Sequence, residues 1–352
     1  MLILPKGGGM EDLTIFFDPI YEEHMTGYGH PERPERLPVA IDALKESGLL
    51  EKFPLKSPRD ATVADIGLNH SVRYIEQVRV LAESGGGHLD MDTAVSRQSY
   101  SAALKAAGAL VQAVDEAFSE SGPQKAFCLV RPPGHHAEPG RGMGFCLFNN
   151  VAIAARYALL RDDVNRVMIV DWDAHHGNGT QDSFYSESSV LYASLHQYPH
   201  YPGTGWVDET GTGAGEGYNI NMPFPGGTGE EYYLEAFERV IIPAGEQFDP
   251  DLVLVSAGYD SHEADLLCQM RLNDLSYTKM TRMLDDLASS CCSGRLIMTL
   301  EGGYNLHAEA RSIVQTVACM AGVEAEVKDG PARASAYPER AREVIEQATR
   351  LR

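Results

Sequence analysis

Short apolar runs alternate with longer segments of helical periodicity along this chain of 352 residues. The runs are rich in β-branched side chains and bounded by turn residues, which is typical of strands buried on both faces of a parallel sheet. They are 13–17, 126–130, 167–170, 190–195, 252–257 and 295–300. Two helices are predicted to begin near residues 38 and 71. Further helices are predicted at 99–118, 149–160, 230–247, 275–290 and 308–321. This alternation predicts an α/β fold with a doubly wound central parallel sheet flanked by helices.

No internal repeat, low-complexity segment or linker interrupts this alternation before about residue 322. We therefore expect a single domain over residues 1–322. The remaining residues, 323–352, form a charged tail with one amphipathic stretch, 338–351, which we expect to be helical. The tail could pack back on the domain, pair with another subunit or do neither.

Unusual polar residues follow the apolar run 167–170, where the chain reads DWDAHHGNG over residues 171–179. Burying a carboxylate or an imidazole without a partner costs roughly several kcal/mol for each group. A divalent metal ion would be a suitable partner. Asp173 and His175 are two positions apart, so in extended chain they point the same way and can share an ion. Asp171, which we place on the opposite side of the strand register, is better suited to pair with a histidine. The alternative is a solvated strand end followed by turn glycines.

Three other predicted strands also end in polar chemistry. His135 and His136 follow 126–130, Asp260 follows 252–257, and Tyr304 follows 295–300. Ligands of open α/β sheets bind beyond the carboxyl ends of the strands, so we expect these side chains to converge. Two aspartates and one histidine make an open site suited to a catalytic zinc or iron(II) ion.

Such a site supports metal-assisted hydrolysis. A metal lowers the pKa of water toward about 7 and polarises a carbonyl group, while a histidine takes the proton. Tyr304 would donate a hydrogen bond to the oxyanion. An ordinary turn tyrosine is an equal alternative on spacing alone.

Composition narrows the partners. Lys and Arg total 29 against 50 Asp and Glu, a formal net charge of -21, which argues against direct binding of nucleic acid and suits cationic substrates. Solubility alone explains the charge equally well. The six cysteines show no CxxC spacing, which favours free thiols. The opening residues 1–13 are too short an apolar segment for a signal peptide, and no run could span a membrane, so we expect a cytoplasmic protein.

Five motifs together resemble the zinc-dependent histone deacetylase family. They are RPPGHHAEPGRGMGFCLFNN (131–150), DWDAHHGNGTQD (171–182), SLHQYPHYPGTG (194–205), SAGYD (256–260) and EGGYN (301–305). The opening HPERPERL, Asn178 and the glutamate of EGGYN are similar to the class II branch and its bacterial relatives, including acetylpolyamine amidohydrolases. The resemblance covers about residues 14–322 and implies an arginase-like domain with about eight parallel strands.

The resemblance also implies site roles. Asp173, His175 and Asp260 match the ligands of one zinc ion, with iron(II) as an alternative in the cell, and Tyr304 matches the tyrosine that stabilises the transition state.

Two histidines match the family's proton-transfer pair. His136 matches the general base and His135 its neighbour, which bonds to an aspartate matching Asp171. Whether the pair divides acid and base work stays open, because coupled histidines titrate together. Asn178 matches the residue that orients His136, where class I has Asp, and an amide would leave His136 less basic.

The tunnel for the acyl-lysine stem is implied in the same way. Phe145 and Tyr201 match its aromatic walls, and Gly134 and Gly303 its deeper walls. Structural potassium sites also look similar, one at Asp171, Asp173, His175, Ser194 and Leu195, and a second at Phe184, Val190 and Tyr218.

Substrate class rests on one loop position. Polyamine deacetylases of this family carry an acidic gatekeeper after the last zinc ligand, and the matching residue here is Leu267, as in lysine deacetylases. Leu266 replaces the usual proline of that loop. We expect deacylation of lysine in proteins or peptides first, and of polyamines or another small amine second, with hydroxamates as inhibitors.

Two further readings stay open. A catalytically silent module that binds acyl-lysine would keep the fold, although Tyr304 and both histidines argue against it. An arginase-like dinuclear manganese hydrolase would need more carboxylates at the metal motifs. The oligomeric state does not follow from the sequence.

Overall fold

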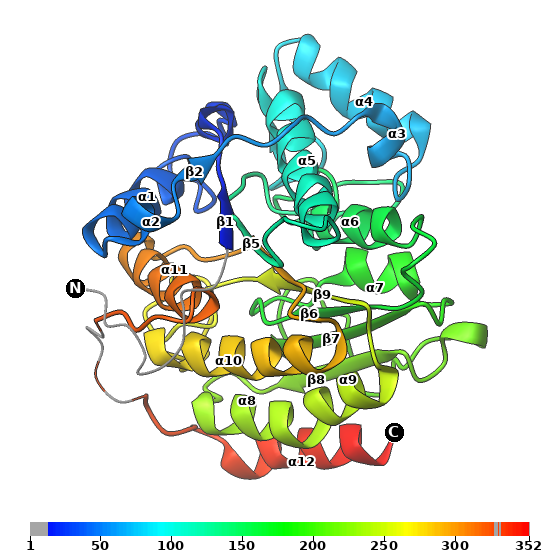
Figure 1. The fold of residues 1–352 in the computed structure, drawn as a ribbon, viewed down its shortest axis with the longest axis vertical. Coiled ribbons are helices and arrows are strands. Elements are labelled where there is room, and N and C mark those ends of the chain that lie inside the picture. Colours follow the sequence, from blue (N-terminus) through cyan, green and yellow to red (C-terminus); the bar gives the residue numbers. More distant parts are fainter. Residues whose placement is uncertain (1–12, 327–329, 331, 352) are drawn as a thin grey trace.

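The computed structural model describes residues 13–326, 330 and 332–351, and its centre is an eight-stranded sheet in which every paired strand is parallel (Figure 1). The order across the sheet is β2-β1-β5-β10-β9-β6-β7-β8. The strands are β1 (Leu13–Phe16), β2 (Leu55–Lys56), β5 (Lys125–Cys128), β6 (Val167–Asp171), β7 (Val190–Gln197), β8 (Asn219–Phe224), β9 (Leu252–Ala257) and β10 (Leu296–Leu300). A small antiparallel pair, β3 (Gly87–His88) and β4 (Ala94–Val95), lies apart from it. The predicted fold class is confirmed.

Helices cover both faces of the sheet, with α5, α6 and α7 on one side and α8, α9 and α10 on the other (Figure 1). Polar caps fix several helix starts, because Ser71, Asn149, Asn273 and Asn305 each accept a backbone N–H of the first turn. The helices are α1 (Arg36–Glu46), α2 (Leu49–Lys52), α3 (Val63–Ile66), α4 (Val72–Glu83), α5 (Ser99–Ala117), α6 (Asn150–Ala158), α7 (Asn178–Phe184), α8 (Glu230–Ala236), α9 (Ile242–Phe248), α10 (Asp274–Cys291), α11 (Leu306–Met320) and α12 (Pro338–Arg350), with 3₁₀ turns η1 (Pro19–Glu23) and η2 (Gly213–Gly215) and a π turn η3 (Phe237–Ile241).

Several elements differ from the sequence prediction, among them two strands of the main sheet, the short helices α2, α3 and α7, the pair β3 and β4, and one long predicted helix. The edge strands β2 and β8 were not predicted, since β2 has two residues and β8 carries asparagines that break an apolar run. The helix predicted over 230–247 is three consecutive segments, α8, η3 and α9, with a proline in the first turn of α9. A π turn is a local adjustment of this kind, which no periodicity reveals.

Four adjacent strands of the sheet centre deliver the site. β5, β10, β9 and β6 are neighbours in that order, and all run in one direction, so the loops after them meet at one edge. These are the strands whose ends carried the unusual residues. The convergence expected from the sequence follows from this topology.

The charged tail packs back on the sheet. Helix α12 buries Ala341, Val344, Ile345 and Ala348 in the same hydrophobic core as the strands, and it lies beside β8 and α8 (Figure 1). Division of the chain at residue 322 stays a prediction. Residues 1–12, on which the expectation of no signal peptide depends, lie outside the described residues.

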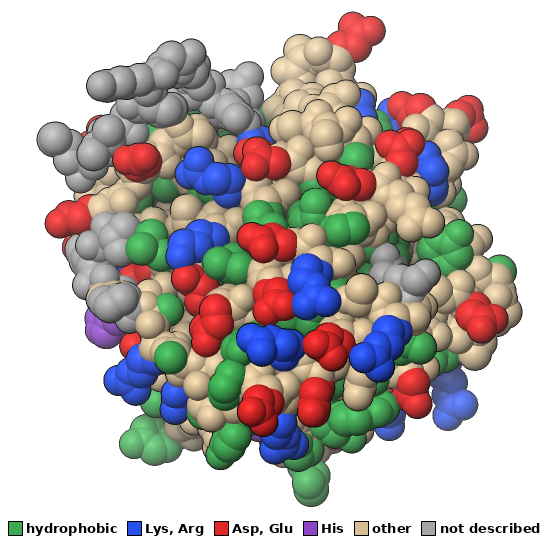
Figure 2. All heavy atoms as spheres, turned by 90° about the horizontal axis from the view of Figure 1, so that it is seen from below, with side chains coloured by type: hydrophobic (Ala, Val, Ile, Leu, Met, Phe, Trp, Pro, Cys, Tyr) green, Lys and Arg blue, Asp and Glu red, His purple; other side chains and the backbone are tan. Residues whose placement is uncertain are grey.

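The surface carries both signs of charge. On the face drawn in Figure 2, acidic and basic side chains are interspersed with small apolar groups. Among the described helices, none combines the length and apolar character that crossing a bilayer requires.

Candidate active site

Asp173, His175 and Asp260 meet at the carboxyl edge of the sheet. The Nδ1 atom of His175 lies 3.1 Å from Oδ1 of Asp173 and 2.8 Å from Oδ2 of Asp260. All three side chains are buried, and one donor atom from each lies within 4.8 Å of the other two. In the part of the chain that the structure describes, only histidines form ion pairs with these two carboxylates. Two carboxylates and an imidazole without a lysine or arginine partner fit a divalent cation.

Two glycines allow the carboxylates to lie this close to the backbone. A Cβ atom on Gly258 would lie 2.1 Å from Oδ2 of Asp173, and one on Gly302 would lie 2.6 Å from Oδ2 of both Asp173 and Asp260. The N–H of Gly302 donates to Asp173 at 2.8 Å. The sequence analysis did not single out either glycine, although both belong to motifs that it quoted.

Burial and mutual repulsion set the charge state of the carboxylates. Burial raises the pKa of Asp260 to about 7, and the charge of Asp173 adds to that effect. Burial also acts on Asp173, but His135 and His175 outweigh it and hold its pKa below the ordinary value. A bound cation would favour the ionised form of both.

The two histidines after β5 have opposite electrostatic surroundings. Burial lowers the pKa of His135, but the charges of Asp173 and Asp171 outweigh it and raise that pKa to about 10. His136 is also buried, and with His135 and His175 nearby its pKa falls well below the ordinary value. His136 is therefore neutral and able to accept a proton.

Hydrogen bonds fix the tautomers of both rings. Nδ1 of His135 donates to Oδ2 of Asp171 at 3.1 Å, and Nδ1 of His136 donates to Oδ1 of Asn178 at 2.8 Å. Each ring then presents its Nε2 atom to the site, and for neutral His136 this atom is the proton acceptor. The ring centres of the pair are 4.0 Å apart.

Asp171 pairs with His135, as the sequence predicted, but not for the reason of strand register given there. Strand β6 ends at Asp171, so alternation no longer decides how Asp171 and Asp173 point relative to one another. Instead, Oδ1 of Asp171 accepts a hydrogen bond from the N–H of Asp173 at 3.1 Å. Its Oδ2 atom accepts hydrogen bonds from His135 and from the hydroxyl of Tyr192. Asp171 thus positions both His135 and the backbone at Asp173.

Glu301 holds the backbone that carries the histidine pair. Its Oε2 atom accepts the N–H groups of Gly134 at 2.6 Å and His135 at 3.2 Å, and its Oε1 accepts the hydroxyl of Ser256 at 3.1 Å. Burial raises its pKa to about 7. The sequence analysis used this glutamate only as a mark of class II similarity, but its place at the end of a buried strand was a signal of a structural role.

Tyr304 lies between two buried charged regions. One is the group Asp173, His175 and Asp260, which we call the metal corner, and the other is an ionic network. Burial, Asp260 and Asp173 raise the pKa of its hydroxyl well above the ordinary value, so it remains a hydrogen-bond donor. Its N–H donates to Asp265 at 2.8 Å, and the guanidinium of Arg36 lies 5.4 Å from its ring centre. Asn305 caps α11 directly after it.

The ionic network comprises two buried arginines and two buried glutamates. Arg131 pairs with Glu32, and Arg36 bridges Glu32 at 3.3 Å and Glu309 at 2.8 Å. Arg36 also donates to the carbonyl of Glu301 at 2.7 Å. Its side chain is fully buried.

Aromatic rings surround the histidines and Tyr304. The ring of Phe145 is 5.9 Å from that of Tyr304, and the ring of Tyr201 is 5.1 Å from that of His136. Phe145 adopts a positive φ of 69°, which is uncommon for a residue other than glycine. Leu267 is partly exposed, with its N–H held by Asp265.

The local backbone explains why two further positions, predicted as walls of the tunnel, are glycines. A Cβ atom on Gly134 would lie 2.6 Å from the amide nitrogen of Asn150, and Gly303 has a φ of 136°. Other side chains could not replace either glycine without movement.

The residues of the predicted potassium sites lie around β6 and β7. Asp171 pairs with Ser194 in the sheet, Leu195 follows it in β7, and both are buried. Phe184 ends α7, Val190 begins β7, and the carbonyl of Tyr218 accepts the N–H of Tyr192. Both potassium sites stay predictions.

Comparison with known proteins gives one consistent answer. The family model described as "Histone deacetylase domain" matches residues 30–320. The chain is 38% identical to "Histone deacetylase 10, chloroplastic" of Oryza sativa subsp. japonica over 341 residues, covering 92% of this chain and 77% of that protein. It is also 38% identical to "Histone deacetylase-like amidohydrolase" of Pseudomonas aeruginosa over 278 residues, covering 79% and 73%. Among solved structures it resembles the crystal structure of the HDA15 HD domain, with 34% identity, a TM-score of 0.88 and coverage of 97% and 94%.

Proposed function

Because this chain belongs to the histone deacetylase family of hydrolases, we propose that it removes acyl groups from the side-chain amine of lysine in proteins or peptides, using one zinc ion. The observation that carries the proposal is the buried trio Asp173, His175 and Asp260 beside His136 and Tyr304. Membership of the family alone supports a deacetylase. The trio supports the more specific proposal that a metal ion assists the hydrolysis.

Asp173, His175 and Asp260 would hold the zinc ion, and iron(II) would fit the same donors. When bound, the ion supplies Lewis acidity that lowers the pKa of a water molecule and polarises the amide carbonyl. The neutral imidazole of His136 takes the proton from the attacking water, and Asn178 holds the required tautomer. Asp173 and Asp171 raise the pKa of His135, and a charged His135 would add positive potential near the developing oxyanion.

Tyr304 stabilises the same oxyanion. Its hydroxyl stays protonated and donates a hydrogen bond, and Asp265 and the Asn305 cap fix the backbone on either side of it. A preorganised donor of this kind acts on the transition state more than on the substrate. Intact Tyr304 and His136 are the reasons to prefer an enzyme over a silent acyl-lysine binding module.

Phe145 and Tyr201 would line the passage for the four-carbon lysine stem, with Gly134 and Gly303 as its deeper walls. Structural potassium at the two predicted sites would stabilise nearby carboxylates. We expect the protein to act in the cytoplasm, without a direct role for nucleic acid or membrane.

The second candidate substrate is an acetylated polyamine or another small acylated amine. Leu267 is uncharged, so it offers no electrostatic attraction to the additional ammonium groups of a polyamine. The net charge of -21 still favours any cationic substrate over a neutral one.

Parallel assays separate these candidates. Turnover of an acetyl-lysine peptide and of an N-acetylated polyamine is measured on the zinc-loaded protein, with a hydroxamate as inhibitor. We expect preference for the peptide and complete inhibition. Leu267→Glu should shift the preference toward the polyamine, whereas Leu266→Glu, on an exposed neighbour, should not. Preference of the unmodified protein for polyamine would overturn the lysine assignment, and inactivity on both substrates would contradict the proposal.

A further inference from the structure

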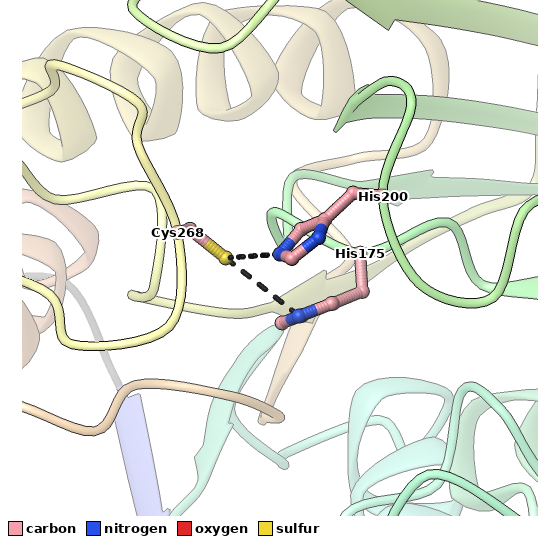
Figure 3. A group of neighbouring side chains, drawn as sticks. All are labelled: His175, His200 and Cys268. Atoms are coloured by element: carbon pink, nitrogen blue, oxygen red, sulfur yellow. Dashed lines mark hydrogen bonds between the residues drawn. The ribbon is translucent and has the colours of Figure 1, made fainter.

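A second group of metal-ligating side chains lies on the far edge of the His175 ring. Cys268 comes from the loop after β9, and His200 from the loop after β7 (Figure 3). The Sγ atom of Cys268 lies 3.6 Å from Nε2 of His175 and 3.5 Å from Nε2 of His200. The two imidazole rings are stacked, with centres 4.9 Å apart. All three donor atoms therefore face one small volume.

The two sulfur-to-nitrogen separations fit a tetrahedral metal. Zinc binds sulfur at about 2.3 Å and imidazole nitrogen at about 2.05 Å, so a tetrahedral angle separates S from N by about 3.6 Å. The observed separations of 3.5 and 3.6 Å match that value. The three donors lie within 4.8 Å of one another, which leaves room for an ion between them.

The donor types differ on the two edges of His175. Its Nδ1 atom faces the carboxylates of Asp173 and Asp260, whereas its Nε2 atom faces a sulfur. Thiol and imidazole donors select soft or borderline cations. We propose that Cys268, His200 and His175 form a second, thiophilic cation site that binds Zn²⁺ in addition to an ion at the carboxylate trio, with His175 shared between the two sites.

The surroundings allow an ion to enter and hold the ligands in place. His200 and Cys268 are only partly buried, so the site opens to solvent. The backbone of Leu267 hydrogen-bonds the His200 ring, which limits its rotation. A water molecule can fill the fourth position.

Binding displaces protons in a defined way. The thiol of Cys268 releases its proton to solvent when sulfur binds the cation. An ion held at this site would lie on the Nε2 edge of His175, whose ring centre is 6.3 Å from that of Tyr201, next to the predicted acyl-lysine passage. It therefore inhibits turnover, an effect that rests on the proposed function, whereas the binding itself does not.

Cobalt titration tests the site directly. Protein that already holds one zinc ion is titrated with Co²⁺, and the sulfur-to-cobalt charge-transfer absorption is recorded. We expect this band to grow over one further equivalent and to disappear in both Cys268→Ser and His200→Gln. Cys291→Ser is the matched control, since Cys291 is a partly buried cysteine of α10, and it should keep the band.

Two outcomes would overturn the proposal. One is the absence of a charge-transfer band at saturating cobalt, and the other is a band that persists in Cys268→Ser. Excess Zn²⁺ should also inhibit the unmodified protein and not Cys268→Ser. Because the spectrum needs no substrate, its result is independent of whether the protein is a lysine deacylase.

Discussion

Two buried charged regions lie on either side of Tyr304, and they are built in opposite ways. In the ionic network, Arg36 and Arg131 offset the charges of Glu32 and Glu309. In the metal corner, Asp173 and Asp260 have only imidazoles as ion-pair partners among the described residues. Burying a charge without compensation is strongly unfavourable.

The difference favours the metal corner over the ionic network as the region that binds a cation. The network is complete within the protein, so its role is to hold Tyr304 and the end of β10. The corner keeps an excess of negative charge, and burial raises the pKa of Asp260 to about 7 without a cation. A bound divalent ion would remove that excess. The two regions should therefore respond differently to mutation.

Asp173→Ala should have the largest effect. Loss of one of three ligands removes most of the bound metal and abolishes turnover, because the remaining pair is too weak a site. Metal content per chain and deacetylase activity are measured together. Asp162→Ala, on an exposed loop, is the control and should change neither. Retention of metal by Asp173→Ala in a Cys268→Ser background, which removes the proposed second site, would overturn the ligand assignment.

Tyr304→Phe should keep the metal and lose turnover. Removing one oxyanion donor lowers kcat by about 10²–10³-fold, with little change in KM. Steady-state kinetics and metal analysis check this split, with Tyr157→Phe as the control because its hydroxyl bonds a surface carboxylate. An unchanged kcat would remove Tyr304 from the mechanism.

Glu32→Gln should reduce stability rather than metal binding. Burial raises the pKa of Glu32, but Arg131 outweighs this and lowers it from 4.5 to about 2. The stabilisation is therefore complete above pH 4.5 and is lost as the pH falls toward 2, and it amounts to about 3 kcal/mol at neutral pH. Denaturant unfolding from neutral to acidic pH would show the difference between variant and parent shrink. Exposed Glu35→Gln should show no such difference, and a gap that does not narrow on acidification would contradict this account.

Asn178→Asp should have the smallest effect, a shift in pH dependence. A carboxylate beside Nδ1 of His136 favours the imidazolium form and raises its pKa by about one unit or more. Because the base must be neutral to accept a proton, the acidic limb of the kcat/KM profile should move to higher pH. Asn165→Asp, on the surface, is the control. A profile that moves to lower pH would exclude His136 as the base.

The sequence predicted the fold class and the edge at which the site forms, because apolar runs that end in polar residues identify the central strands. It did not predict β8, whose Asn219 and Asn221 interrupt the apolar pattern, although both side chains donate to the side chain of Gln181. The role of Arg36 and Glu309 could not be predicted either, since they are 273 positions apart and meet only in the folded chain.

The candidate ligands were predictable from motif chemistry, but their supports were not. Gly302 lies against two carboxylates only because β9, β6 and β10 bring their ends together. Cys268 and His200 come from separate loops, and no spacing in the sequence links them. Long-range contacts of this kind follow from tertiary packing.

The most direct test of the metal corner is activity against metal equivalents. Protein stripped by a chelator is titrated with Zn²⁺, and hydrolysis of an acetyl-lysine peptide is followed. The account predicts no activity in the stripped protein and a linear rise that ends at one equivalent per chain. Activity that survives complete metal removal, or that appears only after two equivalents, would contradict a single catalytic ion held by Asp173, His175 and Asp260.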